Sequence, residues 1–339
     1  MERHRSAIGF LSILPFSLAV FLVPGILFAV SGPVLPDGAA ARTTARIPVI
    51  LDTDIGDDID DTWALVMLLK SPEFDLKLVT TTYGKAEYRA KIAAKILTVA
   101  GRTDVPVGLG AGGREGTGGQ AAWVNDYELA RYTGRVHQDG VQALIDVINA
   151  SKRPVTVISI GPSTTVAEAL TRAPGIVAKA FFVGMQGSVR KGYDGGAVGP
   201  EWNVKCDVPA ARKALLAPWK RTTITPLDTC GLVRLKGERF VALAASSDTL
   251  VRALLENYRL WANKPSLGEL RESSVLFDTV AVYLAFPATP CLSPLEKLAI
   301  AVADGGLTRI DPAGNEMFVA TAWQDLNGYQ DFLVKRLLQ

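Results

Sequence analysis

Short apolar runs alternate with longer segments of helical periodicity along most of the chain. Apolar and β-branched runs predict strands over residues 48–51, 76–82, 155–160, 180–183 and 222–225. Apolar positions at helical spacing predict helices over 60–69 and 86–100, one that begins at Ser163 as N-cap, and one over 209–216. This alternation favours a parallel sheet that is covered by helices on both faces.

The predicted fold is therefore α/β, a Rossmann-like open and mostly parallel sheet formed by one domain over residues 42–339. Residues 237–262 are expected to be mostly helical, and 298–339 to form short strands and a last helix. The Gly-rich stretch 108–119 predicts a mobile loop, because no Lys-Ser/Thr pair follows it as in phosphate-binding loops. Ligands of such sheets bind beyond the carboxyl ends of the strands, so we expect the functional residues there.

Residues 1–41 have a different character from the rest of the chain. Arg3, His4 and Arg5 precede an uncharged, largely apolar stretch over 6–36, and small residues follow at 39–41. This order is typical of a secretory signal peptide and its cleavage site, although the apolar run is long enough for an uncleaved membrane anchor. Either reading predicts a domain outside the cytoplasm, periplasmic or secreted, which is held at a membrane only if the segment stays uncleaved.

Composition excludes several classes of protein. The 339 residues are 48% hydrophobic, which argues against a disordered chain. Lys and Arg number 36 against 34 Asp and Glu, so the formal charge of +2 predicts no nucleic-acid partner. The three cysteines, Cys206, Cys230 and Cys291, are too few and too scattered for a zinc knuckle or a disulfide framework.

Six aspartates lie within ten residues directly after the first predicted strand: Asp52, Asp54, Asp57, Asp58, Asp60 and Asp61. Carboxylates so close together repel one another unless a cation or several donors neutralise them. Outside residues 1–41 the chain has a single histidine, His137, so the donors favour Ca²⁺ or Mg²⁺ over zinc. One alternative is a solvated loop that caps the next helix. Another is a phosphatase with Asp52 as its nucleophile, for which the chain offers no convincing downstream Lys and acidic pair.

Four ordered segments, which span about residues 47–339, resemble the inosine–uridine nucleoside hydrolases. They are Ile50-Leu51-Asp52-Thr53-Asp54-Ile55-Gly56-Asp57-Asp58-Ile59-Asp60-Asp61, Ser159-Ile160-Gly161-Pro162-Ser163-Thr164, Val183-Gly184-Met185-Gln186-Gly187 with Glu201-Trp202-Asn203 and Asp207, and Phe277-Asp278-Thr279-Val280-Ala281. The resemblance implies the nucleoside hydrolase fold and Ca²⁺-dependent cleavage of purine or pyrimidine ribonucleosides to ribose and free base. It also implies a nucleoside as the small-molecule partner, and a homodimer or homotetramer.

The resemblance also implies a role for each matched residue. Ca²⁺ would be held by Asp54, Asp61, the carbonyl of Ile160 and Asp278, and Asp54 would also be the general base that activates metal-bound water. Ribose would be held by residues of three segments: Asp60, Glu201, Asn203 and Asp278, with Met185 lining the sugar pocket. Asp52 would support the loop from behind. Positive charge that develops on the ribosyl ring explains why carboxylates surround it.

The sequence departs from the family pattern at several positions. Asp57-Asp58-Ile59 replaces a single residue, so the opening loop is two residues longer and offers Asp57 or Asp58 as competing metal ligands. Phe277 stands where the family has a histidine thought to help the base leave, while Lys85 and Gly195 stand where asparagines usually contact the sugar. These departures leave open a metal-dependent ribose- or nucleoside-binding homologue with weak or no hydrolysis.

The contacts to the base are the least defined part of the prediction. His137 is a candidate contact or leaving-group acid, with a surface loop residue as the alternative. Trp202 is the better stacking candidate, because it lies between two matched ribose contacts. Aromatic residues of the predicted helical regions could also stack on a base, although such residues usually pack in the core: Trp123, Tyr127, Tyr258 and Trp261.

Overall fold

The computed structural model describes residues 45–286 and 292–339. The predicted signal peptide or anchor over residues 1–41 and Cys291 lie outside the described residues. Within these two ranges, no helix combines the length and the apolar character that a membrane span requires. Residues 44–339 form one compact unit.

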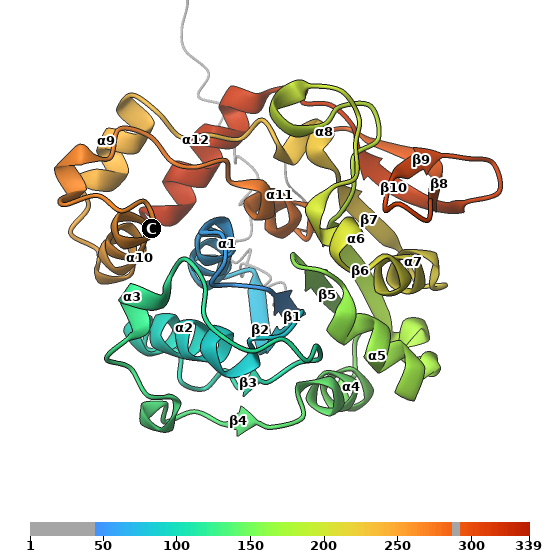
Figure 1. Ribbon diagram of the computed structural model, residues 1–339, viewed down its shortest axis with the longest axis horizontal. Helices are drawn as coiled ribbons and strands as arrows, with labels where there is room; N and C mark the ends of the chain where they lie inside the picture. Colours follow the sequence, from blue (N-terminus) through green and yellow to red (C-terminus); the bar gives the residue numbers. More distant parts are fainter. Residues whose placement is uncertain (1–44, 287–291) are drawn as a thin grey trace, which may run out of the picture. The chain divides into compact units, whose positions relative to one another are not determined.

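A ten-stranded sheet runs through this unit in the order β4-β3-β2-β1-β5-β6-β7-β10-β8-β9 (Figure 1). Its strands are β1 (Ile47–Thr53), β2 (Phe74–Thr81), β3 (Val107–Gly108), β4 (Val136–His137), β5 (Val155–Ser159), β6 (Ala180–Met185), β7 (Thr222–Thr225), β8 (Leu295–Val302), β9 (Thr308–Ile310) and β10 (Asn315–Ala320). Neighbouring strands are parallel from β4 as far as β10, and only β8 and β9 at one edge add antiparallel pairs. The predicted mostly parallel α/β sheet is confirmed.

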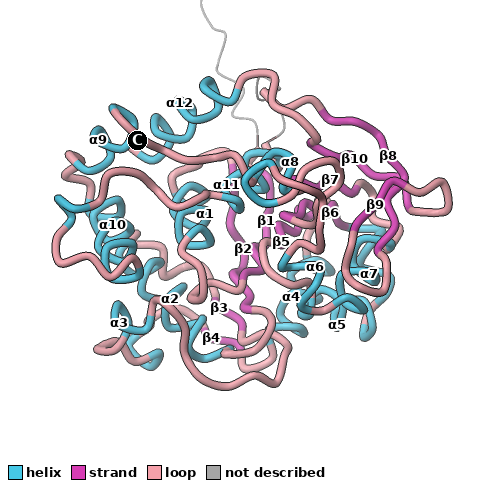
Figure 2. Tube along the Cα trace, turned by 45° about the horizontal axis from the view of Figure 1, so that its top comes forward, coloured by secondary structure: helices cyan, strands magenta, loops and turns pink. Residues whose placement is uncertain are grey.

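Helices flank the central strands (Figure 2). They are α1 (Asp60–Leu69), α2 (Ala86–Val99), α3 (Ala121–Val124), α4 (Gly140–Ala150), α5 (Thr164–Arg172), α6 (Trp202–Cys206), α7 (Val208–Leu216), α8 (Leu227–Cys230), α9 (Glu238–Ala244), α10 (Thr249–Trp261), α11 (Phe277–Leu284) and α12 (Leu326–Leu337). Apolar residues of α1, α2, α10, α11 and α12 share one hydrophobic cluster, and those of α4, α5 and α7 share a second. Each cluster covers one face of the sheet.

Strand β1 illustrates why a continuous apolar run marks a strand of this kind. Val49 and Leu51 belong to one hydrophobic cluster, while Ile50 between them belongs to the other. All three side chains are fully buried. Successive side chains of a strand point to opposite faces, so a strand that is covered on both faces needs apolar residues at consecutive positions.

Several predicted elements differ from those in the structure. The predicted helix over 60–69 coincides with α1. β1 begins earlier and ends later than the predicted run 48–51, whereas β2 begins two residues earlier and ends one residue earlier than the predicted run 76–82. Ser163 occupies the N-cap position of α5, yet its side chain makes no capping hydrogen bond; its Oγ lies 3.4 Å from Ser159 Oγ instead. The sequence reading also missed β3 and β4, which are two residues long, and did not delimit α4.

The strand order positions the site. β1 lies between β2 on one side and β5 on the other, so successive strands are added in opposite directions from this point. Loops that follow β1 and β5 therefore diverge and leave a crevice beyond their carboxyl ends. The acidic segment follows β1, and Ile160 follows β5, so both lie at this crevice.

Candidate functional site

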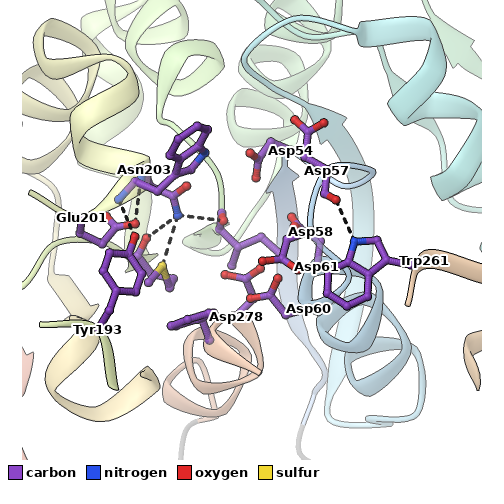
Figure 3. A pocket seen from close by; sticks show the side chains of 14 residues that line it. Asp54, Asp57, Asp58, Asp60, Asp61, Tyr193, Glu201, Asn203, Trp261 and Asp278 are labelled. Atoms are coloured by element: carbon purple, nitrogen blue, oxygen red, sulfur yellow. Dashed lines mark hydrogen bonds between the residues drawn. The ribbon is translucent and has the colours of Figure 1, made fainter. Parts of the chain in front are cut away.

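A cavity of about 410 Å³ opens beyond the carboxyl ends of β1, β5 and β6 (Figure 3). Residues from six separated parts of the chain line it: Asp54, Asp57, Asp58, Asp60, Asp61, Ile160, Met185, Tyr193, Glu201, Trp202, Asn203, Trp261, Phe277 and Asp278. The structure thus brings together ten of the residues that the sequence predicts for metal, ribose and base. Of the remaining predicted residues, Asp52 lies behind the cavity and His137 lies elsewhere.

Asp60, Asp61 and Asp278 form the tightest acidic group, with one carboxylate oxygen of each lying within 4.8 Å of those of the other two. Asp60 and Asp61 stand in the first turn of α1, and Asp278 stands in the first turn of α11, which packs beside α1. Burial raises the pKa of all three carboxyl groups, and repulsion between neighbouring aspartates raises it further. A hard divalent cation, which prefers oxygen ligands, can neutralise these three buried carboxylates.

Asp54 faces the same cavity from the loop after β1. A Cβ on Gly161 would stand 2.6 Å from Asp54 Oδ1 and 2.8 Å from its backbone nitrogen, so only glycine permits this close approach of the two loops. Burial raises the pKa of Asp54 to about 6, against the opposing attraction of Arg89. A carboxyl group with this pKa is suited to accept a proton near neutral pH.

Asp52 and Thr53 hold the acidic loop from inside the protein. Asp52 is fully buried, its Oδ1 accepts a hydrogen bond of 2.8 Å from Thr80 Oγ1, and it does not line the cavity. Thr53 Oγ1 donates to Asp61 Oδ1 and accepts from the backbone nitrogen of Ile55 at 3.1 Å. Asp52 therefore lies behind the cavity wall, whereas a phosphatase nucleophile would have to face the cavity.

The opposite wall consists of polar groups around α6. Asn203 Nδ2 donates to the carbonyl oxygens of Ile160 (3.1 Å) and Met185 (3.0 Å), which ties the ends of β5 and β6 together. Glu201 caps α6, and its carboxylate accepts from the backbone nitrogens of Asn203 (2.7 Å) and Gly187 (2.9 Å). Burial raises the pKa of Glu201 to about 7. Both side chains are thereby fixed at the cavity wall.

A buried arginine that the sequence reading missed organises the longer loop. Arg89 of α2 is fully buried and donates to the carbonyl oxygens of Gly84 (2.9 Å) and Ile55 (3.1 Å), to that of Asp54, and to the carboxylate of Asp57 (2.9 Å). Lys85 Nζ lies 2.6 Å from the same carboxylate. Lys85 is thus paired with Asp57 and is not among the lining residues, so it does not take the place of the family's sugar-contacting asparagine.

Four aromatic residues complete the cavity wall. Trp261 Nε1 donates to the carbonyl oxygen of Asp57 (3.0 Å), and its ring stacks on Tyr258. Tyr193 packs edge-on against Phe277 with ring centroids 6.1 Å apart, and its hydroxyl accepts from the backbone nitrogen of Trp202 at 3.0 Å. Tyr193 was not predicted; its only signal is an aromatic residue inside the glycine-rich stretch 192–199.

Other candidates lie away from the cavity. His137 belongs to β4 at the edge of the sheet and is not among the lining residues. Gly195 lies in the same 3-10 turn as Tyr193 but does not line the cavity. Trp123 and Tyr127 are buried in the core, as the alternative reading had it. Of the cysteines, Cys206 and Cys230 are free thiols within the described residues.

Comparisons with known proteins identify relatives of this chain. A relative named pyrimidine-specific ribonucleoside hydrolase RihA, from Escherichia coli, is 28% identical over 229 residues, which are 62% of this chain and 70% of that protein. A relative named non-specific ribonucleoside hydrolase RihC, from Klebsiella pneumoniae, is 28% identical over 275 residues, which are 77% and 85% of the two chains.

Solved structures share the fold. A structure titled plant nucleoside hydrolase PpNRh1 has a TM-score of 0.71 at 22% identity and covers 86% of this chain and 99% of its own. An inosine-uridine preferring nucleoside hydrolase from Bacillus anthracis has a TM-score of 0.68 at 19% identity, with 86% and 99% of the two chains covered. The model of the inosine-uridine preferring nucleoside hydrolase family matches residues 49–324. The chain therefore belongs to the inosine-uridine preferring nucleoside hydrolase family.

Proposed function

We propose that this protein is a calcium-dependent hydrolase that cleaves the N-glycosidic bond of ribonucleosides to ribose and free base. The observation that carries the proposal is the pairing, across one cavity, of the buried acidic group with the fixed polar groups of α6. The first group is suited to a divalent cation, and the second is suited to sugar hydroxyls. Membership of the family supports the same reaction.

The donor set supports a hard cation. Asp54, Asp61 and Asp278, together with the carbonyl oxygen of Ile160, would hold the ion, and Asp60 lies close enough to Asp61 and Asp278 to share in the site. Every one of these donors is oxygen, and Ca²⁺ accepts six to eight such ligands, which leaves room for water and for sugar hydroxyls. When bound, the ion lowers the pKa of water and so makes a nucleophile available near neutral pH.

The residues of the chain supply the remaining steps. Asp54 accepts the proton of the attacking water. Glu201 and Asn203 orient the ribose through its hydroxyls, while Met185 packs against the ring, so that the anomeric carbon faces the water. As the glycosidic bond breaks, the surrounding carboxylates stabilise the positive charge that develops on the ribosyl ring.

We propose that the base side of the cavity accepts both purine and pyrimidine bases. The relatives carry names that differ in specificity, one pyrimidine-specific and one non-specific, and a solved relative is titled an inosine-guanosine hydrolase. Trp202, with half of its surface exposed, and Trp261 offer flat faces on which either kind of base can stack. The substrate set of the first test therefore includes both purine and pyrimidine nucleosides.

Ribose release from inosine, adenosine, uridine and cytidine tests the proposal, with the full protein assayed in Ca²⁺ and after chelation. We expect release from at least one nucleoside, loss of activity with the chelator, and recovery on adding Ca²⁺ in excess. Hydrolysis that is unaffected by complete chelation contradicts the metal requirement. Calorimetric binding of nucleosides without release of ribose in Ca²⁺ would support the binding homologue instead.

We further propose that the domain acts outside the cytoplasm, because residues 1–41 have the pattern of an export signal. Intact-mass measurement of protein recovered from the extracytoplasmic fraction is expected to show a chain that begins near residue 42. A full-length chain in the membrane fraction would support the anchor, and a full-length chain in the cytosol would contradict export. A homodimer or homotetramer remains part of the proposal.

A further inference from the structure

The backbone of the acidic loop, residues 54–59, is held by donors that do not line the cavity. The carbonyl oxygens of Asp54 and Ile55 accept hydrogen bonds from Arg89. That of Gly56 accepts from the hydroxyl of Tyr88 at 2.8 Å. Both Tyr88 and Arg89 are buried, and neither lines the cavity. The loop therefore presents carboxylates to the cavity while its backbone is bonded to the protein behind it.

Gln120 adds two further donors from another part of the chain. Its backbone nitrogen donates to the carbonyl oxygen of Gly56 at 3.1 Å, and its Nε2 donates to that of Asp58. Gln120 is fully buried and does not line the cavity. It directly follows the Gly-rich stretch 108–119, and a Cβ on Gly118 would stand 2.6 Å from the carbonyl oxygen of Gly56. Glycine at this position lets the chain come close enough for Gln120 to bond the loop twice.

The amide oxygen of Gln120 connects the acidic loop to two helices. It accepts from Thr62 Oγ1 of α1 at 2.9 Å and from Asn257 Nδ2 of α10 at 2.6 Å. Thr62 directly follows Asp61 in the first turn of α1. Two donors at the amide oxygen fix the orientation of the amide, so that its nitrogen faces the carbonyl oxygen of Asp58. One buried side chain thus fixes the acidic loop relative to the first turn of α1.

These bonds oppose the mutual repulsion of the carboxylates. Asp54 and Asp58 belong to the loop, and Asp60 and Asp61 belong to the first turn of α1. Like charges held so close together tend to drive the loop and the helix apart. A residue that orients metal ligands typically contributes about 10–100-fold to metal affinity. Gln120 is uncharged, so it can hold the loop without competing with a cation for the carboxylates.

We infer that Gln120 is a positioning residue of the proposed Ca²⁺ site. It keeps the carboxylates of the acidic loop and those of the first turn of α1 in the arrangement that one ion can bind, and it contacts neither the ion nor the substrate. This inference rests on the proposed function and adds to it a residue that acts through the metal ligands. No local pattern could have indicated it, because Gln120 bonds residues 58, 62 and 137 positions away in the sequence.

The test is the Ca²⁺ affinity of the folded Gln120→Met protein, measured by calorimetric titration with Ca²⁺ alone and no substrate. Methionine keeps most of the length and volume of the side chain, but it has no donor for Asp58 and no oxygen for Thr62 and Asn257. We expect the dissociation constant for Ca²⁺ to rise about 10–100-fold. At Ca²⁺ concentrations that saturate the variant, kcat for ribose release should return to near the wild-type value, because the bound ion then holds the carboxylates itself.

Gln330→Met is the matched control for loss of a buried glutamine. Gln330 of α12 is also buried, its Nε2 donates to the carbonyl oxygen of Arg234 at 2.9 Å, and its Oε1 accepts from Arg239 at 2.8 Å. Neither partner belongs to the acidic loop or lines the cavity. We expect this variant to lose stability in chelator, as Gln120→Met does, but to keep the wild-type dissociation constant for Ca²⁺. If both variants lose stability and both bind Ca²⁺ as tightly as the wild type, Gln120 has only a structural role and the inference is wrong.

Asn257→Leu tests the same role by a milder change, in case Gln120→Met does not fold. It removes one of the two donors at the amide oxygen of Gln120. It also removes Asn257 Oδ1, a buried oxygen without a hydrogen-bond partner among the described residues, so the cost in stability should be small. We expect the dissociation constant for Ca²⁺ to rise about fivefold, as for the loss of one hydrogen bond.

The wild-type titration separates the two levels of the argument. Binding of Ca²⁺ by the wild type that neither Gln120→Met nor Asn257→Leu weakens overturns the role of Gln120 and leaves the proposed function intact. A wild-type protein that binds no Ca²⁺ and releases ribose from no nucleoside overturns the proposed function itself.

Discussion

Replacing Asp54 with Asn is expected to lower kcat for ribose release by about 10²–10⁴-fold. The substitution keeps the size and shape of the side chain but removes its capacity to accept a proton. The backbone around it should stay in place, because Arg89 holds the carbonyl oxygen of Asp54 rather than its side chain. The measurement is kcat at saturating nucleoside over a series of Ca²⁺ concentrations.

Asp60→Asn is the informative comparison for this variant, because Asp60 lies in the same acidic group but has no proposed proton-transfer role. We expect its defect to lie mainly in KM and in the Ca²⁺ requirement, and to shrink as both concentrations rise. The Asp54→Asn defect should persist in kcat under the same conditions. A variant Asp54→Asn that regains full activity at high Ca²⁺ would mean that Asp54 only holds the ion and that another group takes the proton.

Much of the fold could be predicted because burial on both faces leaves a direct trace in the sequence. Ile50, Val49 and Leu51 pack into two different hydrophobic clusters, so β1 has to be apolar throughout. The first two residues of α1, Asp60 and Asp61, could likewise be placed, because acidic residues favour a helix N-terminus and because they follow such a strand. Short elements such as β4 leave no comparable trace, since two residues define no periodicity.

The residues of the site could be predicted only within the segments that resemble the family. Asp54, Asp278, Glu201 and Asn203 do meet in one cavity. How closely Asp60 and Asp61 approach Asp278 depends on how α11 packs beside α1, which the pattern of the sequence does not show. Contacts between residues far apart in sequence leave no periodic signal along the chain.

The longer acidic loop shows the same limit. Asp57 could be interpreted as a competing metal ligand, because the local sequence of a carboxylate that follows a strand does not distinguish a metal ligand from the partner of a lysine or arginine. The structure pairs it with Lys85 and Arg89, which lie 28 and 32 residues further along the chain. Lys85 itself stands where the family pattern has an asparagine that contacts the sugar. Two departures from the family pattern, which look independent in sequence, therefore contact each other in the fold.

Arg89→Met is expected to lower the free energy of unfolding by about 3–5 kcal/mol, because each buried carbonyl oxygen that loses its donor costs about 1–3 kcal/mol. Methionine fills much of the volume of the arginine stem but donates no hydrogen bond. It would leave three buried carbonyl oxygens and one side of Asp57 without their donor. Denaturant unfolding of the wild-type and variant proteins, at equal Ca²⁺, measures the difference.

Arg172→Ala is the control for this variant, because Arg172 is likewise an arginine paired with carboxylates, those of Asp139 and Glu168, but at the protein surface. Its loss should cost less than about 1 kcal/mol, as for other exposed ion pairs. Arg89→Lys should fall between the two, because it keeps the charge but cannot reach all the carbonyl oxygens at once. If Arg89→Met unfolds with the same midpoint as Arg172→Ala, the longer acidic loop does not depend on this buried cation, and the segment from Asp54 to Asp57 is held by its other contacts.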